Sequence, residues 1–274
     1  AVGFFSGWPI ILILLADKLR TIGHFTLADV LKDRFSDRRV VLVATLGYFP
    51  VVVIYLSAQF IAMAWLLNYI FDVGYELLVT ALTALALVTA LTGRMIFSSR
   101  AQMIKAGLVI TLMLVITALA FDRASSSLSE LFSIDVWKAT SVINGGAVSK
   151  DSPLALFSLG IALILGPVGL PHVMSRFFSV ADERRARMSV FYATGMIGIF
   201  YILIILLGFL TINLLDQTET PVTNAGSNLI LVHLAQSIGG EFLTAVLVAI
   251  LVVVLFSVMT SLVLTGSSAF SHDW

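Results

Sequence analysis

Seven long apolar runs constrain the fold of this chain more than any other feature of its sequence. The runs have 16 to 32 residues, and polar segments separate them. A helix needs about 20 apolar residues to cross the roughly 30 Å hydrocarbon layer of a membrane. The sequence therefore predicts a polytopic integral membrane protein. Its predicted spans cover residues 1–16, 40–71, 75–92, 103–121, 154–180, 188–215 and 242–270.

We predict that the spans are all helical. Lipid offers the backbone no hydrogen-bond partner, so only helices and closed barrels satisfy it internally, and the period-2 alternation of a barrel is absent. We expect an all-α integral membrane fold that forms one membrane domain over residues 1–274. The chain begins inside one apolar run and ends four residues after another. We therefore expect it to be a fragment, incomplete at both ends.

Composition excludes several classes of function. Hydrophobic residues make up 59% of the chain and charged residues 12%, whereas soluble domains average about 45–50% and about 25%. The 16 basic and 16 acidic residues cancel, which argues against a nucleic-acid partner.

There is no cysteine, and the four histidines are scattered, so we predict no transition-metal site. No nucleophile–base pair or phosphate-binding loop occurs, so we predict no catalytic residues, no cofactor and no enzyme activity.

The positions of lysine and arginine predict the orientation of the chain. Basic residues concentrate in the loops on the cytoplasmic side of a membrane. In this chain 13 of the 16 basic residues fall in alternate loops and their flanks. We therefore place the protein in the cell (inner) membrane as a multi-pass protein, with the Ala1 end outside and the Trp274 end cytoplasmic.

The span at 154–180 contains the most distinctive local pattern. Gly166, Pro167, Gly169 and Pro171 fall within six residues. Prolines withhold backbone donors and glycines weaken a helix, so carbonyl groups here are expected to lose their amide partners at membrane depth. Interrupted helices of this kind hold substrate and ions in transporters. The alternative is a proline kink that neighbouring helices absorb. We take the four residues as candidates for substrate binding.

The last span carries a row of hydroxyl groups. Ser257, Ser261, Thr265 and Ser268 follow helical spacing, with Thr260 beside them. Such oxygens suit a hard cation, and we take Ser257, Ser261 and Thr260 as candidate cation ligands. The alternative is close helix packing with hydroxyl groups bonded back to their own helix. Considered alone, the row fits that alternative better.

Other polar residues inside the spans are few. Tyr55 and Gln59 lie one turn apart, and Asn68 follows. They either face a cavity or form hydrogen bonds between helices, and we include Tyr55 and Gln59 among the substrate candidates. No ionisable residue lies in the middle of a run, which argues against a proton relay.

Several motifs together resemble those of the sodium:solute symporter family, and its acetate and monocarboxylate branch is the most similar. No single motif is decisive, but their order and spacing are specific, and they extend over almost the whole chain. They are Phe25-Thr26-Leu27-Ala28-Asp29-Val30-Leu31, Arg34-Phe35, Gln102-Met103-Ile104-Lys105-Ala106, Gly169-Leu170-Pro171-His172, Arg176-Phe177-Phe178, Ser189-Val190-Phe191-Tyr192-Ala193-Thr194-Gly195, Ser268-Ala269 and Ser271-His272-Asp273.

This resemblance implies a leucine-transporter-like inverted-repeat fold, present in part. The seven spans would be core helices two to eight, and the first core helix would lie upstream of Ala1. By position, Ser257 matches a hydroxyl ligand for sodium in the family. Val258 stands where many sodium-coupled relatives have a second hydroxyl, so Thr260 or Ser261 substitutes for it or sodium binds more weakly. The coupling ion, sodium or proton, is therefore left open.

We expect a secondary active transporter that couples a cation, sodium in the first instance, to a small organic solute. The expected solute is acetate or another short monocarboxylate, and the partners are the solute, sodium and the lipid bilayer. Two alternatives remain. One is a symporter-like transmembrane sensory module of a larger signalling protein, and the other is a sodium symporter for a neutral solute such as an amino acid or sugar.

Overall fold

The computed structural model describes residues 2–15, 31–32, 35, 37–91, 99–124, 153–170, 173, 183–215 and 229–273. Every regular element within these ranges is a helix, which confirms the predicted all-α class. The leucine-transporter-like inverted repeat stays a prediction. The elements are α1 (Val2–Ile10), the π-helical turn η1 (Ile11–Leu15), α4 (Arg38–Phe71), α5 (Tyr75–Leu91), α6 (Ser99–Ala124), α9 (Pro153–Gly169), α11 (Glu183–Leu215) and α12 (Ile230–Asp273).

Four of these helices are long and apolar enough to cross a membrane. They cover Arg39–Phe71, Ala101–Ala124, Arg187–Thr211 and Ile230–Ser267. Helices α5 and α9 are apolar but have 17 residues each, which corresponds to about 26 Å at 1.5 Å per residue. The predicted count of seven spans is therefore not confirmed. The structure supports a multi-pass membrane protein with four spans of full length among the described residues.

Helix α4 has a side-chain cap at its start and a left-handed turn at its end. Asp37 precedes it in an extended conformation, and its Oδ1 accepts a hydrogen bond from the amide of Arg39 at 2.9 Å, which satisfies one of the first free amides. At the other end, Asp72 has φ 50° and donates its amide to the carbonyl of Asn68 at 2.9 Å. The side chain of Asn68 donates to the carbonyl of Val73 at 2.8 Å. Asn68 therefore has a structural role, in closing the turn toward α5.

Helix α12 changes direction at Gly240. This residue has φ 64° and ψ −158°, a backbone conformation that is open almost only to glycine. The predicted span at 242–270 corresponds to the part of α12 after this kink. The part before it, residues 230–239, was not predicted, and it contributes Val232, Leu234 and Ala235 to the buried core.

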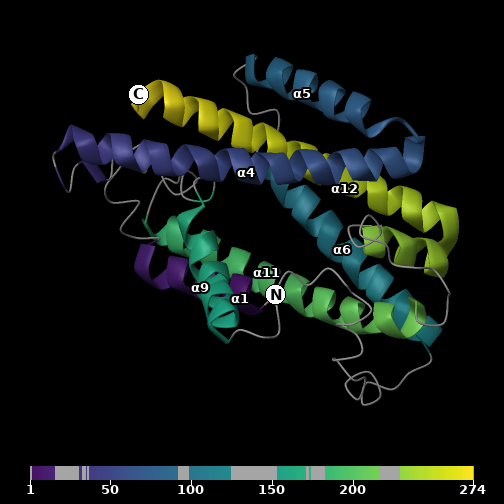
Figure 1. Cartoon of the computed structure of the whole chain (residues 1–274). Coiled ribbons are helices and arrows are strands. Elements are labelled where there is room, and N and C mark those ends of the chain that lie inside the picture. The colour runs from purple at the N-terminus through teal and green to yellow at the C-terminus, as the bar shows by residue number, and fades with distance from the viewer. Residues whose placement is uncertain are drawn as a thin grey trace.

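The helices pack into two adjoining groups (Figure 1). Helix α4 lies along α12, and α5 packs against both. Helix α6 crosses from α12 to α11, while α1 packs against α9 and α11. The larger apolar core joins α6, α11 and α12, and a smaller one joins α4, α5 and α12. Helices α6 and α12 therefore meet at the boundary between the two groups.

Much of the outer surface of the described helices is apolar. Large exposed side chains occur on every span, and Phe242 and Leu91 are more than four-fifths exposed. Soluble monomers rarely expose large contiguous apolar patches. Such a surface suits lipid, in agreement with the span lengths.

The kink in α12 generates a testable prediction about stability. Replacing Gly240 by alanine should cost about 1–3 kcal/mol, because an L side chain is strained at this φ and ψ. A Cβ atom there meets nothing within 4 Å, so the effect would come from the backbone alone. Thermal unfolding of the full-length protein in detergent should show a lower midpoint for Gly240→Ala.

The matched control is Gly208→Ala. Gly208 lies within α11, where a Cβ atom also meets open space. Alanine in a helix interior is favoured over glycine by about 0.5–1 kcal/mol, so this variant should unfold at the same or a higher temperature. Equal midpoints for the two variants would contradict the strained geometry at Gly240.

Candidate functional site

Helix α9 ends within residues 166–171, the stretch in which the sequence predicts an interruption. Helix α9 runs through Gly166 and Pro167 and ends at Gly169. One proline removes a single hydrogen bond, at a cost of about 3 kcal/mol, and that loss does not unwind a helix. Pro171 lies outside the described residues. Gly166 and Pro167 are therefore part of the helix, and only the backbone near Gly169 is at a helix end.

Helix α9 packs mainly against α1. Its large apolar side chains Leu154, Phe157 and Leu165 are more than half exposed. Among the described residues, helices α6 and α11 line a cavity together with Ser257 and Ser261 of the last span, and no residue of α9 lines it.

The hydroxyl row of α12 divides into two kinds of residue. Thr260 donates its hydroxyl to the carbonyl of Phe256 at 2.9 Å, and Thr265 donates to the carbonyl of Ser261 at 2.7 Å. These two bonds match the alternative in which hydroxyl groups bond back to their own helix. Ser257 and Ser261 instead line a cavity with helices α6 and α11. Thr260 is buried beside Ser257 and Ser261 but does not line the cavity.

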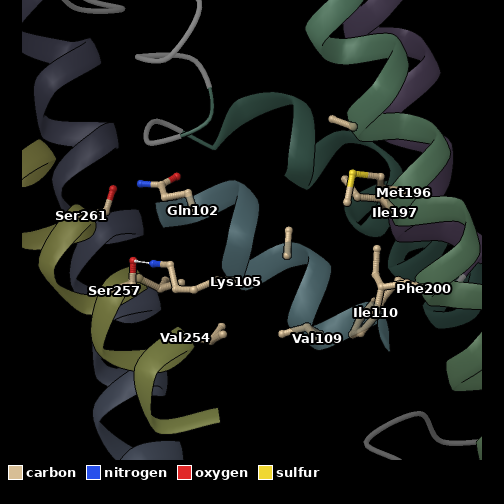
Figure 2. A pocket seen from close by; sticks show the side chains of 13 residues that line it. Gln102, Lys105, Val109, Ile110, Met196, Ile197, Phe200, Val254, Ser257 and Ser261 are labelled. Atoms are coloured by element: carbon tan, nitrogen blue, oxygen red, sulfur yellow. Dashed lines mark hydrogen bonds between the residues drawn. The ribbon is translucent and has the colours of Figure 1, made fainter. Parts of the chain in front are cut away.

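The cavity has a volume of about 430 Å³. Its wall is polar on one side and apolar on the other (Figure 2). Gln102 and Lys105 of α6 extend toward Ser257 and Ser261 of α12. The remaining described lining residues are apolar, and they are Ala106, Val109, Ile110, Ala193, Met196, Ile197, Phe200, Val254 and Val258.

Lys105 is the residue that sequence reasoning missed. It is the third residue of the predicted span at 103–121, and the orientation prediction counts it among the basic residues that flank a cytoplasmic loop. In the structure its ammonium group donates a hydrogen bond to the hydroxyl of Ser257 (Figure 2). The available signal was its motif, Gln102-Met103-Ile104-Lys105-Ala106, which places a cation and an amide one helical turn apart.

The bond between Lys105 and Ser257 determines the electrostatics of the polar side. Ser257 is 9% exposed, and Lys105 is half-buried. Among the described lining residues Lys105 alone carries a charge, and none is acidic. The predicted cation ligand Ser257 therefore already contacts a positive group.

The remaining predicted site residues do not join this cavity. Tyr55 and Gln59 are half-buried on α4 and are absent from its lining. Their helix is tied to α12 further along by the hydroxyl of Tyr69, which donates to Oε1 of Gln236 at 2.7 Å. Within the described ranges no group of three histidine, cysteine, aspartate or glutamate side chains could hold a metal ion.

The absence of cysteine from the 274 residues makes the cavity directly testable. A single cysteine at Ser261 should react with a water-soluble thiol reagent, because this position lines the cavity. A single cysteine at Leu262, which is 1% exposed and buried in the helix packing, serves as the control and should stay unmodified. Labelling of both positions, or of neither, would contradict the assignment of the cavity.

Comparison with known protein families matches residues 1–274 to the sodium:solute symporter family. The match extends over all the helices and the segments between them, so it concerns the whole chain rather than one motif. It agrees with the family that the sequence motifs resemble. The match names no branch of the family and no substrate.

Proposed function

The chain belongs to the sodium:solute symporter family, and on that premise we propose that it carries a short monocarboxylate such as acetate. Members of the family are transporters rather than enzymes, and they couple the movement of a solute to that of a cation. The family implies sodium as the coupling ion and the lipid bilayer as the surroundings. The identity of the solute is our proposal.

The cavity between α6, α11 and α12 is the observation that supports this solute. It offers one ammonium, one amide and two hydroxyl groups on one side and an apolar wall on the other. A monocarboxylate has one negative charge and a short apolar remainder, so it complements both sides. Hydrogen bonds to charged groups are stronger than neutral ones, so the carboxylate would bind at Lys105.

The same lining is less suited to the alternative solutes. A sugar needs several polar partners around its ring, because each buried hydroxyl without a partner costs free energy. An amino acid needs an anion for its ammonium group, and no acidic side chain lines the cavity among the described residues. A dicarboxylate would leave its second charge without a cationic partner.

The predicted binding residues enter the proposal with different support. For the cation we propose Ser257 and Ser261, with Thr260 as a neighbouring oxygen. For the substrate we propose Gly166, Pro167 and Gly169, because they are among the last four residues of α9, whose carbonyl groups have no intrahelical partner. The other proposed substrate residues are Pro171, Tyr55 and Gln59, which rest on the motif pattern and on their polarity.

Uptake measurements test the proposed function. The full-length protein in liposomes should take up labelled acetate when sodium is imposed outside, and choline in place of sodium should abolish the uptake. Unlabelled propionate should compete, whereas proline and glucose should not. Competition by proline or glucose would instead favour a neutral solute. Sodium binding without any solute uptake would favour the sensory module.

A substitution at Ser257 tests the cation assignment. Ser257→Ala should raise the sodium concentration for half-maximal acetate uptake by about tenfold, because a charged partner loses a hydroxyl ligand worth about 1.5–3 kcal/mol. Thr265→Val is the control, since the hydroxyl of Thr265 donates to its own helix and should leave the sodium dependence unchanged. The same half-maximal concentration in the Ser257→Ala and wild-type proteins would refute the role of Ser257.

A further inference from the structure

The cavity between α6, α11 and α12 extends well beyond its polar side. On α6 the lining runs from Gln102 to Ile110, and on α12 it runs from Val254 to Ser261. At 1.5 Å per residue these stretches are about 10–12 Å long. On both helices the polar residues lie toward one end, and Figure 2 shows the apolar side chains of α11 at the other. The cavity is therefore amphipathic along its length.

Core packing holds the apolar side of the cavity in place. Val109 of α6 and Phe200 of α11 pack against the larger apolar core. Both are half-buried, as are Ile110 and Ile197, so part of their apolar surface remains open to the cavity. Side chains that are packed among many neighbours keep defined rotamers. The apolar side is thus a preformed surface that a hydrocarbon chain can cover.

The cavity is larger than acetate requires. Its volume of about 430 Å³ corresponds to about fourteen water molecules at roughly 30 Å³ each. Acetate has four non-hydrogen atoms, and its single methyl group covers only a small part of the apolar side. Methylene groups that replace water against apolar side chains release free energy roughly in proportion to the area they cover. A longer chain therefore complements this cavity better than acetate does.

We propose that the apolar side of the cavity is a tail subsite, which binds the hydrocarbon chain of a medium-chain monocarboxylate such as hexanoate. The tail subsite consists of Val109 and Ile110 of α6 and Met196, Ile197 and Phe200 of α11. This inference rests on the proposed function in one respect, the carboxylate of the solute. The position of the chain follows from the apolar side chains, and it is independent of which polar residue the carboxylate contacts.

Direct binding of a homologous series tests the tail subsite. Acetate, butyrate and hexanoate are titrated calorimetrically into the full-length protein in nanodiscs with sodium present, and the heats for empty nanodiscs are subtracted. Each buried methylene should tighten binding by about threefold, so hexanoate should bind roughly eightyfold more tightly than acetate. The heat-capacity change of binding should also become more negative with chain length, because it reports the burial of apolar surface.

Substitutions that fill the apolar side locate the chain. Ala193 lines this side from α11, and Ala193→Leu should lower the ratio of hexanoate to acetate affinity by at least about tenfold, because about two methylenes lose their place. Val254→Phe fills the cavity from α12 and should act in the same direction, in case leucine at position 193 impairs folding. Ala118→Leu makes the matched change at an exposed position of α6 outside the described lining, and it should leave the ratio unchanged.

The outcomes separate the tail subsite from the proposed function. If acetate uptake depends on sodium but hexanoate binds no more tightly than acetate, the tail subsite is wrong and the proposed function stands. An affinity ratio that neither Ala193→Leu nor Val254→Phe lowers would also overturn the tail subsite, because the chain would then lie elsewhere. If 1-hexanol binds as tightly as hexanoate, Ala193→Leu weakens both and acetate does not bind, the tail subsite holds and the proposed carboxylate solute fails.

Discussion

Backbone amides inside a bilayer have no water to bond, and the fold of this chain follows from that constraint. Each span keeps its hydrogen bonds within one helix. Side-chain hydroxyl groups obey the same rule, since Thr45, Thr117, Thr211 and Thr260 all donate to the carbonyl four residues earlier. The constraint also explains why α9 stays wound through Pro167, because unwinding would expose several polar groups where a single proline removes only one.

With the backbone satisfied, the few polar side chains determine where function can lie. Lys105 and Ser257 are 152 positions apart in the sequence, and the packing of their helices brings the two side chains together. Lys105 is half-buried, and its ammonium donates a hydrogen bond to the buried hydroxyl of Ser257. A polar group inside a membrane protein needs such partners, so this contact marks the polar side of the cavity.

The sequence was sufficient to predict the helices whose ends coincide with changes in polarity. The predicted spans at 40–71 and 75–92 agree closely with Arg38–Phe71 and Tyr75–Leu91, because Asp37 and Asp72 mark the boundaries of the first. The helix at 230–239 was missed because His233 and Gln236 interrupt its apolar pattern, although the residues between them are buried. The kink at Gly240 could not be predicted from the pattern of apolar residues, because that pattern carries no information on the backbone angle φ.

The candidate site could be predicted only in part. Ser257 and Ser261 follow from helical spacing, but which helix faces them depends on tertiary packing. The structure places α6 beside them. Lys105 was counted with the basic residues that flank a cytoplasmic loop, because lysine and arginine concentrate on that side of a membrane. Its direction toward α12 becomes visible only when both helices are in place.

The three-residue turn after α4 helps to determine which helices surround the cavity. Asn68 and Asp72 close this turn with two hydrogen bonds, so α5 returns beside α4, and α12 packs against both. Helix α12 also packs on α6, and α6 packs on α11. The cavity lies where α6, α11 and α12 meet, so a displacement of α6 relative to α12 would change its width.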